Sequence, residues 1–186
     1  LRILMKKRII ALGLLWCLSA VMLQAARVDT VLVRSAAMNK DVKVVYVLPD
    51  KAIGKQACPV VYLLHGYGGN ARSWVQLKPE LPQMADEKGI IFVCPDGKNS
   101  WYWDSPKNPS YRYETFISSE LVNYTDAHYA TIPEKRARAI TGLSMGGHGA
   151  MWNAIRHKDV FGAAGTTSGG VDIRPFPKNW EMKKQL

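Results

Sequence analysis

The sequence has few cysteines, few acidic residues and no long apolar run. Its three cysteines have no metal-binding spacing and are too few for the disulfide framework of a small secreted scaffold. The 15 acidic side chains are outnumbered by 25 basic ones, but beyond residue 26 the basic residues form no run that would bind nucleic acid. No uncharged stretch reaches the ~20 residues of a membrane span. These absences favour one domain with an ordinary core and no metal, cofactor or nucleic-acid partner.

Residues 1–26 have the pattern of a secretory signal peptide. A basic segment at 6–8 precedes an apolar stretch at 9–23, and a cleavage region with small residues ends at Ala26. Residues 1–4 lie before Met5, the first methionine, and are expected to be upstream of the start. A membrane anchor is the alternative, but the apolar stretch is short for one. We expect signal cleavage, a mature domain over 27–186 and a periplasmic or secreted location, with no stable membrane span.

Apolar patterns along the mature part predict an α/β fold. Alternating or continuous β-branched runs predict strands at 27–35, 42–49, 58–66, 89–97, 137–142 and 161–170. Helical spacing predicts helices at 80–88, 113–129 and 145–157. Gly89 is a natural residue to end the first of these helices. Strands and helices that alternate in this way predict a mostly parallel sheet with helices on both faces.

Two details of this layout can be checked against a structure. The helix at 145–157 is expected to bury Ala150, Met151, Ala154 and Ile155 on one face. The two cysteines of the mature part open one buried strand and close the next, which places them roughly 15–20 Å apart if the strands are parallel neighbours. Because a disulfide needs Cα atoms within about 7 Å, we expect Cys58 and Cys94 to be free thiols.

The frame Gly142-Leu143-Ser144-Met145-Gly146 lies between a predicted strand and a predicted helix. That setting is the one a nucleophile elbow requires, whereas the Gly-x-Ser-x-Gly pattern alone is weak evidence. The turn holds the serine in a strained conformation, and the two glycines leave room for the backbone to fold back on itself. The serine hydroxyl lies at the start of a helix, where the helix dipole and the N–H of Met145 favour negative charge that develops on a substrate.

A second motif, HGYGGN at 65–70, follows the predicted strand 58–66. A glycine-rich turn at the carboxyl end of a central strand can direct backbone N–H groups at a ligand, and hydrolases of this layout use such a loop as half of the oxyanion hole. We expect the N–H of Tyr67 to face the N–H of Met145 across the substrate carbonyl. The alternative for each motif is a plain glycine-rich turn, but both follow strands that end at the same sheet edge.

The segments HGYGG, SWYWDSP, YETFISSEL, RARAITGLSMGGHGA and SGGVDIRPFP together resemble the esterase D-type esterases, from about Val28 onward. That family has the α/β-hydrolase fold and includes S-formylglutathione hydrolases, family-one carbohydrate esterases such as acetylxylan and feruloyl esterases, and mycolyltransferases. The resemblance implies Ser144 as the nucleophile, with Tyr67 and Met145 as oxyanion donors. It also implies an acyl or leaving-group pocket lined by Trp101, Tyr102 and Asp104.

In that family an acid and a histidine follow the nucleophile along later strands. Here only His148 and His157 follow it, both on the helix behind the elbow, and neither is expected to be the base. His65 belongs to the predicted oxyanion loop and His128 ends a helix. Asp172 has no histidine to orient and is expected to be a loop residue. We therefore expect the acid and base beyond residue 186, in a hydrolase domain that lacks its last strands.

The sequence thus predicts an exported serine carboxylesterase, or the major part of one. The expected substrates are small or carbohydrate esters, and export favours acyl groups on extracellular carbohydrate. One alternative is an inactive, truncated hydrolase that at most binds ligands through the same pocket. Another is an acyltransferase or a thioesterase similar to S-formylglutathione hydrolase, since both would use the same serine.

Overall fold

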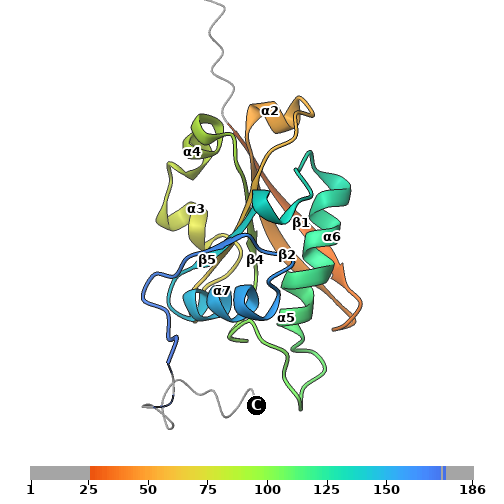
Figure 1. Ribbon diagram of the computed structural model, residues 1–186, viewed down its shortest axis with the longest axis vertical. Coiled ribbons are helices and arrows are strands. Elements are labelled where there is room, and N and C mark those ends of the chain that lie inside the picture. The colour runs from red at the N-terminus through yellow and green to blue at the C-terminus, as the bar shows by residue number, and fades with distance from the viewer. Residues whose placement is uncertain (1–25, 173, 175–186) are drawn as a thin grey trace, which may run out of the picture.

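A six-stranded mixed sheet organises the residues that the computed structural model describes, 26–172 and 174 (Figure 1). The strands are β1 (Arg27–Ser35), β2 (Lys40–Leu48), β3 (Val60–Leu64), β4 (Ile91–Pro95), β5 (Arg138–Gly142) and β6 (Ala163–Ala164). Their spatial order is β1-β2-β4-β3-β5-β6; β2 is antiparallel to β1 and β4, and the strands from β4 to β6 are parallel. The α/β fold and the first five predicted strands are confirmed. The predicted signal peptide, apart from Ala26, lies outside the described residues.

Side chains alternate between the two faces of the central strands, and helices cover both faces. In β3, Val60, Tyr62 and Leu64 join the larger apolar cluster, whereas Val61 and Leu63 face the smaller one. The helical elements are α2 (Asp50–Ile53), α3 (Ser73–Leu77), α4 (Leu81–Lys88), α5 (Tyr113–Thr115), a π-helical turn (Phe116–Glu120), α6 (Leu121–His128), a 3₁₀ turn (Lys135–Ala137) and α7 (Met145–Arg156). The α3–α4 segment covers the smaller cluster, and α6 and α7 cover the larger one. None of the helices within the described ranges is long and apolar enough to cross a membrane.

Three local features refine the predicted elements. The predicted helix 80–88 ends at Gly89 in the left-handed conformation (φ 62°), as expected. The predicted helix 113–129 contains the π-helical turn, in which the Ser118 hydroxyl donates to the carbonyl of Glu114. The predicted strand 161–170 is reduced to two exposed residues, Ala163–Ala164, followed by an isolated bridge between Leu143 and Thr167.

The buried face of α7 differs from the predicted one. Ile155, expected inside, is 60 % exposed, and only Ala150 of the four predicted residues is fully buried. The buried residues of α7 are instead Met145, Gly146, Gly147, His148, Gly149, Ala150 and Asn153. Close packing explains the difference, because a Cβ on Gly149 would lie 2.5 Å from the Tyr102 ring and no larger residue fits there.

Cys58 and Cys94 are both free and buried, as predicted. Val93 pairs with Tyr62 in the parallel register, so Cys94 lies level with residue 63, five positions beyond Cys58. At about 3.3 Å per residue this offset exceeds the reach of a disulfide. Burial also raises the pKa of the Cys94 thiol, which keeps it protonated and unreactive in the folded state.

Alkylation of protein unfolded without reductant should therefore modify both Cys58 and Cys94. Peptide mass spectrometry measures the alkylated fraction of each, and a sample reduced before alkylation is the control. Equal modification of the two samples is the expected result. A Cys58–Cys94 cross-linked peptide in the unreduced sample would contradict this assignment.

Candidate active site

Ser144 occupies a strained turn between β5 and α7. Its backbone has φ 54° and ψ −117°, a region that non-glycine residues rarely adopt and that costs about 1–3 kcal/mol. The side chain is exposed, and the residue precedes Met145, the first residue of α7. Because the first N–H groups of a helix have no intrahelical partner, the N–H of Met145 is oriented for an acceptor outside the helix. The strand–turn–helix geometry is as predicted; the role of Ser144 stays a prediction.

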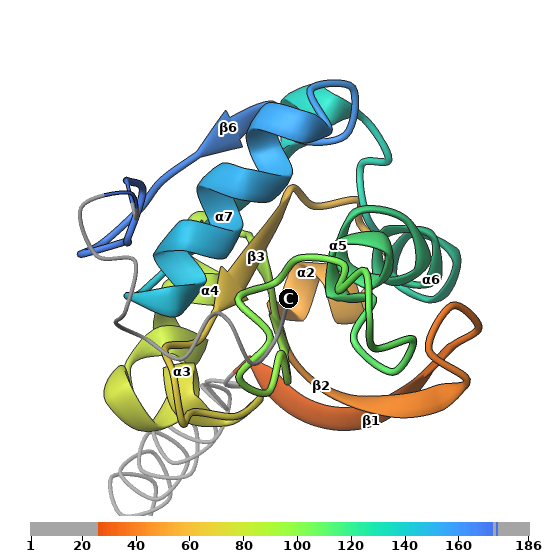
Figure 2. The ribbon, with the colours of Figure 1, turned by 90° about the horizontal axis from the view of Figure 1, so that it is seen from below.

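Two glycines permit this turn, because peptide groups pack against them. A Cβ on Gly142 would lie 2.3 Å from the carbonyl carbon of Gly146, and a Cβ on Gly146 would lie 2.2 Å from the Leu64 carbonyl oxygen. The N–H of Leu143 also donates to the Leu64 carbonyl at 3.2 Å. The first turn of α7 is thus in direct contact with the end of β3, and Figure 2 shows α7 running back alongside that strand.

The HGYGGN loop reaches the elbow from the end of β3. A Cβ on Gly66 would lie 3.6 Å from the Cβ of Ser144, so the structure brings the two predicted motifs together. The loop turns through a bond from the Gly69 N–H to the Gly66 carbonyl at 3.0 Å, and the Gly68 N–H donates to Asn99 Oδ1 at 2.8 Å. The Tyr67 side chain is 49 % exposed. Its backbone role as an oxyanion donor stays a prediction.

His65 holds the HGYGGN loop in place through hydrogen bonds of its ring. It is almost fully buried, and its Nε2 accepts the Gly97 N–H at 2.9 Å. An acceptor Nε2 leaves the proton on Nδ1, which donates to the Gly66 carbonyl at 2.7 Å. The Tyr102 hydroxyl donates to the His65 carbonyl at 3.1 Å, so the aromatic loop holds the HGYGGN loop in place.

The residues predicted to line a substrate pocket are largely committed to packing. Trp101 and Tyr102 are 5 % and 0 % exposed and have positive φ values of 57° and 61°. Asp104 accepts hydrogen bonds from the N–H and the hydroxyl of Thr115 at 3.1 and 2.6 Å. Tyr102 therefore acts on the site through the loop that it supports. Contact of the three residues with substrate stays a prediction.

The other three histidines of the chain are engaged away from the Ser144 hydroxyl. The ring of His148 is buried, with Nδ1 bonded to the Gly170 carbonyl at 2.8 Å and the indole rings of Trp101 and Trp103 edge-on at 5.3 and 5.5 Å. Burial lowers the pKa of His148 and favours its neutral form. These contacts give His148 a packing role and agree with its exclusion as the base.

His128 and His157 lie at the ends of helices. The His128 ring stacks on Tyr124 and its Nδ1 bonds the Tyr124 carbonyl at 2.8 Å. His157 follows α7, about 20 Å from Ser144 at 1.5 Å per helical residue, and its Nε2 lies 2.9 Å from the Glu114 carboxylate. Within the described ranges, no group of three histidine, cysteine, aspartate or glutamate side chains is arranged to hold a metal ion.

Asp172 lies in the loop that follows β6, as expected. Its carboxylate is paired with the exposed guanidinium of Arg174 at 2.7 Å. Hydrogen bonds from that guanidinium and from the Arg174 N–H lower the pKa of Asp172 to about 2. The pair is local and on the surface, so it gives Asp172 no partner at the elbow.

The loop before Asp172 contains a contact that the sequence did not reveal. The Ser144 N–H donates to the Thr167 carbonyl at 2.8 Å, and the Thr167 N–H donates to the Gly142 carbonyl at 3.0 Å. Thr167 thus continues the sheet beside the elbow and fixes the strained residue from the β6 side. A glycine-rich run, GTTSGG at 165–170, was the only available signal, and it indicates a turn without naming its partner.

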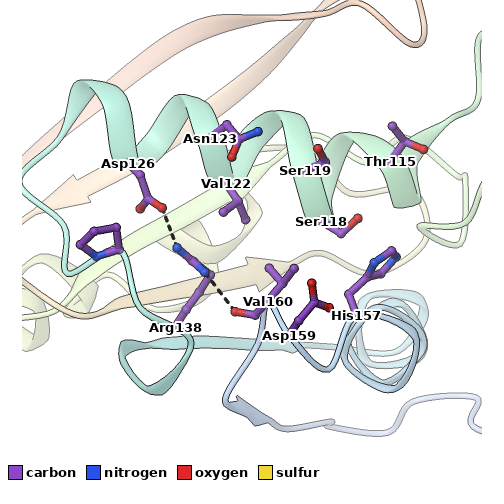
Figure 3. Close-up of a pocket in the computed structure, with 11 residues that line it drawn as sticks. Thr115, Ser118, Ser119, Val122, Asn123, Asp126, Arg138, His157, Asp159 and Val160 are labelled. Carbon is purple, nitrogen blue, oxygen red and sulfur yellow. Dashed lines mark hydrogen bonds and ion pairs between the residues drawn. The ribbon is translucent and has the colours of Figure 1, made fainter.

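A cavity of about 520 Å³ lies apart from the elbow, between α6, the start of β5 and the chain after α7 (Figure 3). Arg138 crosses it and is fixed by Asp126 at 2.6 Å and by the Val160 carbonyl at 3.1 Å. Because Arg138 opens β5 and Gly142 closes it, the cavity lies about 13 Å from the elbow along the strand. It belongs to the opposite edge of the sheet from Ser144.

Comparison with known proteins identifies the family and its relatives. A family model described as "Putative esterase" matches residues 35–185. An acetyl esterase from Caldicellulosiruptor saccharolyticus is 29 % identical over 136 residues, covering 68 % of this chain and 50 % of the relative. The MPT51/MPB51 antigen of Mycobacterium tuberculosis is 34 % identical over 159 residues, covering 84 % and 48 %. The chain spans about half the length of these relatives.

Solved structures share the fold. An S-formylglutathione hydrolase from Agrobacterium tumefaciens superposes with a TM-score of 0.72 at 23 % identity, covering 86 % of this chain and 66 % of that one. A ferulic acid esterase superposes with a TM-score of 0.64 at 30 % identity, covering 75 % and 56 %. These matches confirm the predicted α/β-hydrolase fold and the predicted resemblance.

The packing at the elbow predicts a sharp difference between glycines. Gly146→Ala should lower the free energy of unfolding by about 3 kcal/mol or more, because the new methyl group meets the rigid Leu64 carbonyl. Gly54→Ala is the matched control: φ is −71° and the nearest atom would be 3.4 Å away. Its expected effect is within about 0.5 kcal/mol. Urea denaturation compares the two, and similar losses would contradict the close-packing account.

Proposed function

The chain belongs to the "Putative esterase" family, and from this premise we propose that it is the nucleophile-bearing part of a serine carboxylesterase. The observation that carries the proposal is the strained, exposed Ser144, which immediately precedes α7 and lies against Gly66. In the proposed reaction, the Ser144 Oγ attacks the carbonyl carbon of an ester. The alcohol leaves, and water then releases the acyl group from the serine.

The oxyanion that forms on the substrate carbonyl needs hydrogen-bond donors on its far side. We assign this role to the N–H groups of Met145 and Tyr67. The Met145 N–H lies at the positive end of the α7 dipole. The Tyr67 N–H belongs to the residue after Gly66, which packs against Ser144. Preorganised donors of this kind typically contribute on the order of 10²–10³ in kcat.

The general base is proposed to come from residues outside these 186. Each of the chain's four histidines is bonded elsewhere: His65 within the HGYGGN loop, His128 to Tyr124, His148 to Gly170 and His157 to Glu114. The chain also spans only about half of its curated relatives, which leaves ample length for a base and its acid. In the complete protein, a histidine would take the Ser144 proton and pass it to the leaving alcohol.

The proposed substrates are acyl esters of extracellular carbohydrate. Support comes from the names of two relatives of about 30 % identity, an acetyl esterase and a ferulic acid esterase. The predicted signal peptide at 1–26 adds the expectation of export. Extracellular carbohydrate that carries acetyl or feruloyl esters is a class of substrate that fits all three observations.

Replacement of the nucleophile tests the reaction type. In the complete gene product, Ser144→Ala should lower kcat on p-nitrophenyl acetate by on the order of 10⁴–10⁶, with KM nearly unchanged. Ser119→Ala, another exposed serine, is the control and should leave the rate unchanged. Wild-type turnover by the Ser144 variant would refute the serine mechanism. An inactive wild-type protein would favour the ligand-binding alternative.

Removal of a single N–H tests the oxyanion assignment. Tyr67→Pro deletes the proposed donor and should lower kcat by on the order of 10²–10³. Tyr67→Ala keeps the N–H and is the control, with an expected loss below about fivefold in kcat if the phenol only contributes binding. Denaturation midpoints of both variants separate loss of the donor from loss of the fold. Equal kcat values for the two variants would exclude Tyr67 as a donor.

A further inference from the structure

Three lysines surround a cavity of about 240 Å³ that no step of the proposed reaction uses. The cavity lies between the β1–β2 hairpin, the loop that follows β4 and the start of α5. Lys40 and Lys43 come from the hairpin, Lys98 from the loop and Tyr113 from α5. Asp96, at the end of β4, forms part of its wall.

The sheet topology places this cavity on the same edge as Ser144. β2 is antiparallel to β4 with Val44 opposite Pro95, so Lys40 lies four residues beyond the end of β4. Ser144 follows β5, which is parallel to β4 and separated from it only by β3. Three to four strand spacings of about 4.8 Å separate β2 and β1, whose residues line the cavity, from β5, so the cavity lies roughly 15–20 Å from the elbow along this edge. The hairpin turn, the loop after β4 and α7 all lie in the lower half of Figure 1.

The cavity carries more positive than negative charge. Its buried carboxylate, Asp96, is already paired with the Lys98 ammonium at 2.8 Å. Its exposed carboxylate, Asp41, lies 3.6 Å from Arg34. Among the described residues, no ion pair within 4.0 Å involves Lys40 or Lys43.

Lys40 is held in place by neutral groups. Its Nζ donates to the Ser110 carbonyl at 2.5 Å and lies 5.1 and 4.7 Å from the ring centroids of Tyr111 and Tyr113. Burial, and next the positive charge of Lys98, lower the pKa of Lys40. Asp96 attracts Lys40 more weakly, and it is itself paired with Lys98. A preorganised ammonium group that forms no ion pair within 4.0 Å and repels a second ammonium is a ready site for an anion.

We propose that this cavity binds a carboxylate carried by the ester substrate, roughly 15–20 Å along the sheet edge from the reacting carbonyl. The carboxylate accepts hydrogen bonds from Lys40, Lys43 and Lys98 and supplies the counter-charge that the site lacks. Two sources have this chemistry: a uronate branch on an acylated glycan and a carboxyl group of a peptidic leaving group. The proposal rests on the proposed function, since it names a recognition element of the same substrate.

Binding measured without turnover tests the site. In the complete gene product with Ser144→Ala, calorimetry compares a xylo-oligosaccharide bearing one glucuronate with the neutral oligosaccharide of the same length. A second pair compares S-methylglutathione with its dimethyl ester. The acidic member of one pair should bind about tenfold more tightly, and that pair identifies the source. The preference should shrink as salt is raised from 50 to 500 mM.

Charge removal assigns the preference to the cavity. Lys43→Gln alone and Lys40→Gln with Lys43→Gln should reduce the tenfold preference to about twofold or less. The denaturation midpoint should be unchanged for the single variant and slightly lower for the double variant, which also loses the contacts of Lys40 with Ser110, Tyr111 and Tyr113. Lys158→Gln is the control, because this exposed lysine follows α7 at the opposite edge of the sheet and should leave the preference intact.

Equal affinity for the acidic and neutral members of both pairs would overturn the proposal. A preference that survives loss of both hairpin lysines would overturn it as well. Neither result depends on catalysis, so failure here differs from failure of the serine mechanism, which the rate of the Ser144 variant decides.

Discussion

The contact between the first turn of α7 and the end of β3 is the constraint on which the site depends. Gly142, Gly146 and the Leu64 carbonyl pack so closely that one methyl group at either glycine would overlap the backbone. Rigid packing of this kind stores strain, because no neighbour can move to relieve it. Ser144 keeps its strained, positive-φ conformation for this reason, with its side chain exposed and the N–H of Met145 beside it. Gly66 follows Leu64 by two residues, so the same contact also sets the position of the HGYGGN loop.

A second layer of contacts fixes that loop before any substrate binds. The loop after β4 supplies the Gly97 N–H to His65 and the Asn99 side chain to Gly68, and the Tyr102 hydroxyl closes the set on the His65 carbonyl. Donors that are already oriented need no reorganisation when charge develops on a substrate. The aromatic loop thus serves the site by positioning, which explains why Tyr102 is fully buried.

Most of the fold and both motifs followed from the sequence because they depend on local patterns. β-branched runs gave the strands, and glycine spacing gave the two turns next to Ser144. The features that the sequence did not predict correctly depend on tertiary contacts. Ile155 has the right helical spacing to be buried, yet α7 packs through its glycines against Leu64 and Tyr102, and Ile155 is left exposed. The bond between Ser144 and Thr167 and the charge balance around Lys40 join segments far apart in the sequence, and no periodicity records such pairings.

The antiparallel start of the sheet has a consequence for substrate recognition. In a purely parallel sheet, only the residues that follow each strand reach the edge where Ser144 lies. β2 runs the other way, so its first residues reach that edge too, and Lys40 and Lys43 line the same cavity as Lys98. The antiparallel direction of β2 therefore places lysine side chains at the same sheet edge as the glycine-rich turns. The turns supply neutral N–H dipoles suited to a transient oxyanion, whereas the hairpin supplies full charges suited to a permanent anion. In the proposed reaction, the turns would stabilise the oxyanion at the reacting carbonyl, whereas the hairpin lysines would bind a carboxylate elsewhere on the same substrate.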